Sequence, residues 1–377
     1  QTLVFRRFLT AYEGNELGIG FFFASWLLWV ALGGMLARLQ TPLAQRVRPH
    51  FSILMLLYVP ACLMQAILVA GARQAAGVAA YEYFPLLKML PHLLYANAPV
   101  PLLTGWLFSV ACQHTVAAPY GATRVYIFEA LGGCLGGVFT TAMLAGGAAD
   151  ESVLLCAAIL PSLSLLLHYP PRRYPPAVLP LVSILAAILF NLDIRVQGYT
   201  NLKNWSQTLP AEGYQGSFVT PQARYLYGSI NGQLNIAARN AVCESLPDQE
   251  HGGSITALHL AQKPNPRRVL VFGHGALGTC LALQEIDSIC EVAWLTPDPS
   301  YASIACKTLL PALPSNDRKL RTPQQDLRRY LREQDSQLDL IIILLPDNTT
   351  LSLNSYLTQE SFGLMARRLH RDGVLGV

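Results

Sequence analysis

The chain has 377 residues, of which 52% are hydrophobic and 13% are charged. Ordinary soluble proteins carry about 25% charged residues, so this composition indicates a membrane protein and excludes a chain that is soluble throughout. The formal net charge of +4 is small for the length, and the basic residues do not cluster with aromatic ones. Nucleic-acid binding is therefore not expected.

Long uncharged runs fill the first half of the chain, whereas most charged residues follow Asn191. A helix that crosses the hydrocarbon core of a bilayer needs about 20 apolar residues. The sequence thus predicts an α-helical multi-span membrane domain with six spans, surrounded by lipid in the bacterial inner membrane. The residues before Arg6 suggest the tail of a seventh span in the intact protein. The predicted spans cover residues 17–37, 51–72, 93–111, 125–148, 153–167 and 177–192.

The fourth predicted span carries one ionisable residue beside a stripe of glycines. Gly132, Gly133, Gly136 and Gly137 form two overlapping small-xxx-small pairs, which let another helix backbone approach closely. Glu129 lies one turn before them, and an unpaired carboxylate within a bilayer is costly, so it should be paired, protonated or near the interface. We expect a structural hydrogen bond from Glu129 to a neighbouring helix, with a proton or substrate site as the alternative.

Basic residues in the short loops indicate how the chain is oriented in the membrane. The side with more arginines is expected to be cytoplasmic. The second half of the chain would then lie on the outer, periplasmic face. That side has Arg38, Arg46, Arg48, Arg124, Arg172 and Arg173, whereas the other has Arg6, Arg7, Arg73 and Lys88 together with Asp150 and Glu151.

No metal site is expected from the cysteines or histidines. The eight cysteines lack the two-residue spacing of zinc, iron–sulfur and haem-attachment motifs, and we interpret them as small buried hydrophobic residues. His92 and His114 lie at span edges, where solvated interfacial side chains are the favoured interpretation and haem or quinone ligands the alternative.

The composition turns polar after Leu192, and the chain divides into three predicted parts. Residues 1–192 form the membrane domain, and residues 193–260 form a β-rich lead-in to a soluble domain. Residues 261–377 form an α/β Rossmann-like domain, which we expect to be truncated at its C-terminal end. The evidence for the last part is the order of an apolar strand, a glycine turn and a helical stretch, which is typical of Rossmann-type units.

The glycine turn follows the apolar run Arg268–Phe272 and contains Gly273, Gly275 and Gly278. Glycines allow a tight turn and a close approach to a ligand, beside the free N–H groups of a helix N-terminus. We therefore predict that these three residues bind a cofactor. The turn also fits the dinucleotide fingerprint, with Asp298 about 20 residues further on as the ribose acid, so NAD binding is an alternative.

Several segments, in their order along the chain, resemble the membrane-spanning branch of the spermidine synthase (polyamine aminopropyltransferase) family. The segments include Arg7-Phe-Leu-Thr-Ala-Tyr-Glu-Gly-Asn-Glu16, Ser25-Trp-Leu, Tyr126-Ile-Phe-Glu, His259-Leu, Pro266-Arg-Arg-Val-Leu270, Asp326-Leu-Arg-Arg-Tyr-Leu331 and Leu353-Asn-Ser-Tyr. The resemblance covers essentially the whole chain. It implies a hydrophobic domain followed by a methyltransferase-type Rossmann-like domain.

The resemblance implies transfer of an aminopropyl group from decarboxylated S-adenosylmethionine to putrescine. A carboxylate must then accept the amine proton and anchor the substrate. The family's ribose glutamate corresponds here to Thr296, its catalytic aspartate to Leu344, and its Tyr-His-Glu segment to Gly253-Ser-Ile255. The acids that remain are Asp298, Asp326, which the resemblance implies to lie near the adenine, and Asp347, implied on the polyamine side.

The first hypothesis is a catalytically degenerate, membrane-anchored protein without a cofactor, which serves as a structural or interaction subunit of a membrane complex. The alternative is an active aminopropyltransferase that binds decarboxylated S-adenosylmethionine and uses Asp347 and Asp326. A third possibility is a small-molecule transporter with Glu129 as the coupling residue, although no inverted repeat is detected. Packing of His274 and Leu277 into the space above the glycine turn would favour the first hypothesis.

Overall fold

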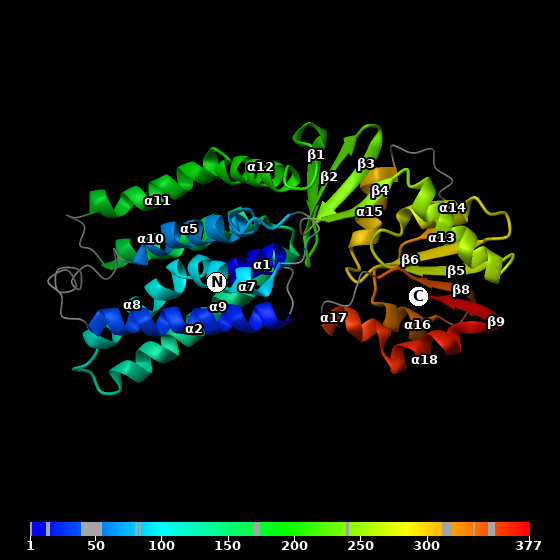
Figure 1. Cartoon of the computed structure of the whole chain (residues 1–377). Helices are drawn as coiled ribbons and strands as arrows, with labels where there is room; N and C mark the ends of the chain where they lie inside the picture. The colour runs from blue at the N-terminus through cyan, green and yellow to red at the C-terminus, as the bar shows by residue number, and fades with distance from the viewer. Residues whose placement is uncertain are drawn as a thin grey trace. The chain divides into compact units, whose positions relative to one another are not determined.

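The structure is a computed structural model that describes residues 2–12, 16–38, 55–79, 82, 84–168, 174–238, 241–310, 319–334, 336–345 and 351–377. The chain forms two compact units, Gln1–Asn201 and Leu202–Val377, and each is considered by itself (Figure 1). The boundary between them lies inside the helix α12 (Leu192–Trp205), which begins where the composition turns polar.

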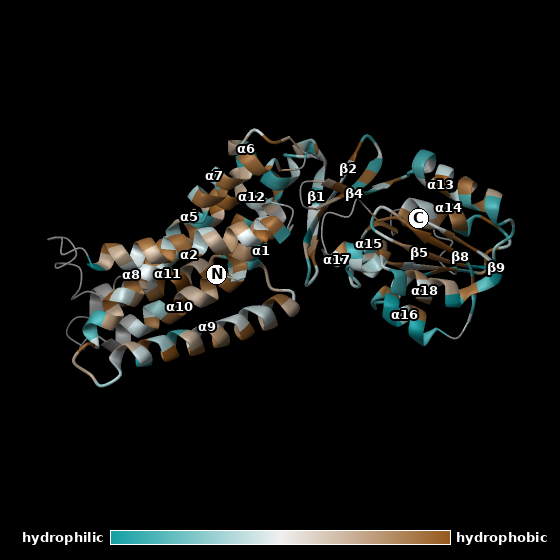
Figure 2. Cartoon of the chain, turned by 60° about the horizontal axis from the view of Figure 1, so that its bottom comes forward, coloured by the Kyte–Doolittle hydropathy of each residue, from teal (hydrophilic) through white to brown (hydrophobic). Residues whose placement is uncertain are grey.

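The first unit is helical. Figure 2 shows that hydrophobic residues surround many of its helices instead of forming a single stripe. Large apolar side chains such as Leu27 and Leu135 are exposed, a distribution that is typical of helices in lipid. Besides α12, the helices of the described residues are α1 (Thr2–Ala11), α2 (Glu16–Arg38), α5 (Tyr58–Ala70), α6 (Ala72–Ala75), α7 (Leu86–Ala96), α8 (Pro99–His114), α9 (Gly121–Ala145), α10 (Asp150–His168) and α11 (Tyr174–Leu189).

Two helices in the described part of the chain, α2 and α9, are long and apolar enough to cross a membrane. The pair α7 and α8 would add a third span if its helices, which meet at a bend of 43°, are taken together. Within the residues that the structure describes, the prediction of six spans is therefore wrong in number. Helix α11, with 16 residues, falls short of the length that a bilayer requires. Residues 51–54, at the start of the second predicted span, lie outside the described residues.

Helices α2 and α8 pack closely at two glycines. A Cβ atom on Gly33 would lie 2.1 Å from the Leu102 carbonyl oxygen, and one on Gly105 would lie 2.0 Å from the Val30 carbonyl oxygen. Glycine is therefore required at both positions for the two backbones to approach this closely. In lipid, such close packing is a main source of helix association, because the hydrophobic effect does not favour contact between helices there.

A buried polar network lies where α7 ends and α8 begins. The Asn97 amide donates to the Phe22 carbonyl oxygen at 3.0 Å and to the Ser25 hydroxyl at 2.8 Å. Gln65 donates to the Asn97 side chain at 2.6 Å and accepts from the Val100 backbone N–H at 3.1 Å. The network thus provides partners for polar backbone groups near the break between the two helices.

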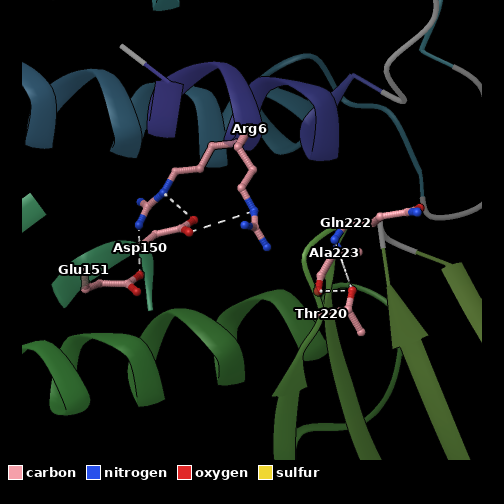
Figure 3. A network of polar contacts seen from close by, with 7 residues as sticks. Arg6, Asp150, Glu151, Thr220, Gln222 and Ala223 are labelled. Atoms are coloured by element: carbon pink, nitrogen blue, oxygen red, sulfur yellow. Dashed lines mark hydrogen bonds and ion pairs between the residues drawn. The ribbon is translucent and has the colours of Figure 1, made fainter. Parts of the chain in front are cut away.

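An ion-pair cluster joins α1 to the first turn of α10 (Figure 3). An Arg7 nitrogen lies 2.8 Å from a Glu151 oxygen, and the Nε atoms of Arg7 and Arg6 lie 3.7 and 3.9 Å from the carboxylate oxygens of Asp150. Each arginine therefore has a carboxylate beside it, which lowers the free energy of holding these charges next to apolar helices.

Helix α9 exposes most of its surface, and its buried residues are Gly121 and Leu144. Glu129 is exposed on this helix, and within the described residues it makes no hydrogen bond to a neighbouring helix. The expected structural bond of Glu129 is thus not found there. The space beside each of the four stripe glycines, which include Gly132 and Gly136, is open.

The second unit contains one antiparallel and one parallel sheet. The antiparallel lead-in sheet has the order β1-β2-β3-β4, from β1 (Tyr214–Val219), β2 (Arg224–Ile230), β3 (Gln233–Ala238) and β4 (Ala241–Leu246). The parallel sheet has the order β7-β6-β5-β8-β9, from β5 (Arg268–Phe272), β6 (Glu291–Leu295), β7 (Leu320–Arg321), β8 (Leu338–Ile343) and β9 (Leu369–Gly376). The helices are η3 (Ala211–Gly213), α13 (Gln249–Gln262), α14 (Leu277–Gln284), α15 (Tyr301–Leu309), α16 (Leu327–Glu333), α17 (Leu351–Asn354), η5 (Ser355–Leu357) and α18 (Gln359–Arg368).

The parallel sheet is covered on both faces (Figure 1). Val269 and Val271 pack with residues of α14 and α15, whereas Leu270 and Phe272 pack with residues of α16 and α18. Successive side chains of a strand point to opposite faces, so a strand with helices on both sides must be apolar throughout. The described structure thus confirms the predicted Rossmann-like α/β domain.

We expect Gly105→Ala to lower the free energy of unfolding by about 1–3 kcal/mol, because the added methyl group would overlap the Val30 carbonyl and force α2 away from α8. The measurement is the thermal unfolding midpoint of the full chain in detergent. The matched control is Gly133→Ala, where nothing lies within 4 Å of the added atom and where alanine favours the helix by up to about 1 kcal/mol. An unchanged midpoint for the Gly105 variant would contradict the close packing.

Candidate functional site

The glycine turn connects β5 to α14 at the carboxyl edge of the parallel sheet. Gly273 has a φ of 148°, and a Cβ atom on it would lie 1.8 Å from the Leu344 carbonyl oxygen. Gly275 has a φ of 74°, a conformation that favours glycine. A Cβ atom on Gly278 would lie 3.0 Å from the Asp248 Cβ. All three glycines thus have a structural reason within the chain, independent of any ligand.

A buried carboxyl group binds the N–H groups of this turn. The Glu244 side chain, on β4, accepts from the Gly275 N–H at 2.7 Å and from the Leu277 N–H at 3.2 Å. It is 2% exposed, and burial raises the pKa of this carboxyl to about 8, although the backbone N–H donors lower it. The donors that an anionic ligand would use at the start of α14 are therefore engaged by the protein itself.

His274 and Leu277 both pack into the protein at this turn. Leu277 is fully buried in the core between the parallel sheet and its helices. The centroid of the His274 ring lies 4.7 Å from that of Tyr301 and 6.3 Å from that of Tyr225. The two tyrosine rings also contact each other, with centroids 4.5 Å apart. Leu277 thus belongs to the core, whereas His274 lies against two aromatic rings, and the expectation that both side chains fill the space above the glycine turn stays a prediction.

Asp298, the predicted ribose acid, follows β6 and is 2% exposed. Its carboxylate accepts from the Thr220 hydroxyl at 2.5 Å and from the Tyr225 hydroxyl at 3.1 Å. It also accepts from the Ser300 N–H at 3.3 Å. Asp298 thus lies at the expected edge of the sheet, but residues of the lead-in sheet and its first turn supply the hydroxyl groups that contact it.

The turn between β1 and β2 holds Thr220 in place for this contact (Figure 3). The Thr220 hydroxyl oxygen accepts from the Gln222 N–H at 3.3 Å and from the Ala223 N–H at 3.0 Å. The Gln222 side-chain amide donates to the Pro297 carbonyl oxygen at 3.1 Å. The turn is therefore fixed both internally and against the loop that carries Asp298.

Asp326, the predicted adenine-side acid, caps the N-terminus of α16. One carboxylate oxygen accepts from the Arg328 N–H at 2.9 Å, and the other accepts from the Tyr356 hydroxyl at 2.9 Å. The Tyr356 ring packs against Phe272 of β5, with centroids 4.7 Å apart. Burial and the Asp326 carboxylate raise the pKa of Tyr356 above its usual range, so the hydroxyl remains a donor.

The resemblance assigns two of the family's acids to Thr296 and Leu344. Both residues make hydrogen bonds within this fold. The Thr296 hydroxyl donates to the Asp298 carbonyl oxygen at 2.5 Å. The Leu344 N–H donates to the Phe272 carbonyl oxygen at 2.7 Å, next to the β5–β8 ladder. Asp347 lies outside the described residues, so its catalytic role stays a prediction. Among the described residues, no three His, Cys, Asp or Glu side chains are grouped so as to hold a metal ion.

Glu244, Thr220 and Tyr225 were not predicted from the sequence as residues of this site. Glu244 is 31 positions from Gly275, and Thr220 is 78 positions from Asp298, so no local motif contains both members of either pair. One signal was available for Glu244. It lies two positions from Val242 and two from Leu246 along its strand, so the sequence places it on the same strand face as these apolar residues. An acidic residue on an apolar strand face needs a buried partner.

We expect the second unit to lose stability as the pH rises from about 4.5 to about 8, by on the order of 2–4 kcal/mol, because Glu244 holds its proton more tightly when folded. The folded pKa is raised, so this stability is fully present below the unfolded pKa. The neighbouring Tyr301 and Cys280 do not titrate in this window, because burial raises their pKa values well above their usual range. The measurement is hydrogen exchange of the β5 amides in the full chain.

The control for this pH dependence is Glu244→Gln, which keeps the shape of the side chain and removes the titration. The variant should lose the pH-dependent part of the β5 protection that the wild type shows. Identical pH profiles of the two proteins would contradict the assignment.

Comparison with known proteins relates about a third of the chain to polyamine aminopropyltransferases. The chain is 30% identical over 123 residues to the enzyme of that name from Lachnoclostridium phytofermentans and 30% identical over 118 residues to that from Streptococcus uberis. The matches cover 32% and 31% of this chain and 43% and 41% of the relatives. The chain therefore spans less than half the length of these relatives.

Comparison with solved structures finds a spermidine synthase in complex with the transition state analogue AdoDATO, at 19% identity and a TM-score of 0.38, covering 43% of this chain and 57% of that one. Another is the spermidine synthase from Thermotoga maritima, at 18% identity and a TM-score of 0.36, covering 43% and 55%. No protein-family model matches the chain. The sequence similarity to the two polyamine aminopropyltransferases supports the resemblance to the spermidine synthase family for the part of the chain that it covers.

Proposed function

We propose that the chain is a catalytically degenerate, membrane-anchored spermidine synthase-like protein that acts as a structural or interaction subunit of a membrane complex. Leu344 carries the proposal, because it occupies the position at which the resemblance requires a carboxylate. A leucine side chain can neither accept a proton from an attacking amine nor pair with an ammonium group. Loss of a general base lowers a reaction rate by about 10²- to 10⁴-fold.

The contacts at the carboxyl edge of the parallel sheet support the same proposal. The glycine turn donates to Glu244, and the carboxylates of Asp298 and Asp326 accept from side chains of the chain itself. A nucleoside would have to displace these hydrogen bonds before making its own, and a buried group that loses a partner is costly. The proposed subunit therefore works without a cofactor.

The helical unit supports a role inside a membrane assembly. Helix α2 and helix α9 have the length and composition for anchoring the chain in a bilayer. Glycine in an exposed helix lowers its stability by about 1 kcal/mol per residue relative to alanine. The open glycine stripe of α9, which includes Gly132 and Gly136, is explained if a helix of a protein partner packs there.

We expect no spermidine to form when the full chain in detergent is incubated with decarboxylated S-adenosylmethionine and putrescine. The reason is the missing proton acceptor at Leu344. Mass spectrometry of the product mixture and calorimetry of cofactor binding are the measurements, with an active polyamine aminopropyltransferase in the same detergent as the positive control. Turnover that disappears in the Asp347→Ala variant would overturn the proposal.

The runner-up is an active aminopropyltransferase that uses decarboxylated S-adenosylmethionine with Asp347 and Asp326. The 30% identity to two polyamine aminopropyltransferases favours it. This function requires the second unit to face the cytoplasm, because its cofactor is a cytoplasmic metabolite. The distribution of loop arginines instead favours the outer face.

The side of the membrane can be tested with Cys290, an exposed thiol in the second unit. We expect a maleimide that cannot cross membranes to label Cys290 in intact cells, because the unit would then face outward. The matched control is Cys290→Ser, which should lose the label even though Cys134 is also exposed in the isolated chain. Labelling only after the cells are broken would favour the active enzyme.

A further inference from the structure

Two loops at the carboxyl edge of the parallel sheet have the chemistry to hold a nucleoside. One is the glycine turn after β5, and the other carries Asp298 after β6. In Rossmann-type folds, the N–H groups of such a turn bind an anionic group and the acid after the second strand binds ribose hydroxyls. In this chain, both loops are hydrogen-bonded to the lead-in sheet, which precedes them in the sequence.

The contacts on the two loops are of the kind that a ligand would make. Glu244 presents carboxyl oxygens to the Gly275 and Leu277 N–H groups, at 2.7 and 3.2 Å. Thr220 and Tyr225 present hydroxyl groups to one oxygen of Asp298, at 2.5 and 3.1 Å. An anionic group and a pair of hydroxyls are also what a ribonucleotide would offer to these same atoms.

The residues that make these contacts belong to one connected element. Tyr225 lies on β2 and Glu244 on β4, and both strands pair with β3. Thr220 belongs to the turn that joins β1 to β2. A displacement of the lead-in sheet would therefore release the glycine turn and Asp298 together.

We propose that the lead-in sheet is an internal occupant of a nucleotide site, which Glu244, Thr220 and Tyr225 keep closed to external nucleosides and nucleotides. The proposal rests on the proposed function, since it explains why a fold of this type would bind no cofactor. The site exchanges between a closed state, filled by the lead-in sheet, and an open state that can bind a ligand. Because only the open state binds, the apparent affinity for a ligand falls as the fraction of open molecules falls.

The test measures binding of ADP and of adenosine to the full chain in detergent by calorimetry. Glu244→Ala opens the N–H donors and should raise the affinity for ADP about tenfold or more over wild type. Glu244→Gln is the matched control, because its amide oxygen can still accept from one of the two N–H groups and its volume still fills the site. This control should bind ADP as weakly as wild type does.

The second arm changes Thr220, which contacts the other loop. Thr220→Val removes a hydroxyl from Asp298 and should raise the affinity for adenosine about tenfold or more. Thr220→Ser keeps the hydroxyl and should not. This arm decides the proposal by itself if Glu244→Ala does not fold, since an unchanged affinity for adenosine overturns it.

Wild-type binding as tight as that of the opened variants also overturns the proposal, because the site would then be open already. This outcome is distinct from failure of the proposed function, which is recognised by spermidine formation in the wild type. A gain of nucleotide binding without turnover supports both. If neither arm raises the binding affinity and no spermidine forms, the proposal of an internal occupant is rejected and the proposed function stands.

Discussion

The hydrogen bonds between Glu244 and the glycine turn are the interaction on which the second unit depends. They join the lead-in sheet to the start of α14, and they place a carboxyl group where its desolvation is costly. Two backbone N–H donors offset part of that cost, and the raised pKa of the carboxyl reduces the rest by favouring the neutral form at neutral pH. Tyr225 of β2, in the same lead-in sheet, donates to Asp298, so this sheet contacts both loops.

Glycines have two separate uses in this chain. In the glycine turn, Gly273 and Gly275 permit a close backbone approach and a left-handed conformation, whether or not a ligand is bound. In the helical unit, Gly33 and Gly105 permit close packing of α2 against α8. A glycine motif that resembles a cofactor fingerprint is thus satisfied here by contacts within the protein, which is why such a motif alone is weak evidence for binding.

Keeping a fold and keeping its chemistry have different physical requirements. The parallel sheet needs apolar strands such as β5 and β8, and these are present. Aminopropyl transfer needs carboxylates at particular strand ends, and the positions that the resemblance assigns to two of them carry Thr296 and Leu344. The similarity to polyamine aminopropyltransferases covers about a third of the chain, and a shared fold does not by itself imply a shared activity.

The sequence by itself determined the Rossmann-like domain, because few other folds contain a continuous apolar strand followed by glycines and a helix. It also located the glycine turn, Asp298 and Asp326. It overestimated the membrane spans, because apolar composition does not reveal where a helix breaks, as it does between α7 and α8. Only the tertiary structure showed that Glu244, Thr220 and Tyr225 reach these sites. Their partners are distant in sequence, and hydrogen bonds between distant residues depend on how two sheets pack, which no local pattern encodes.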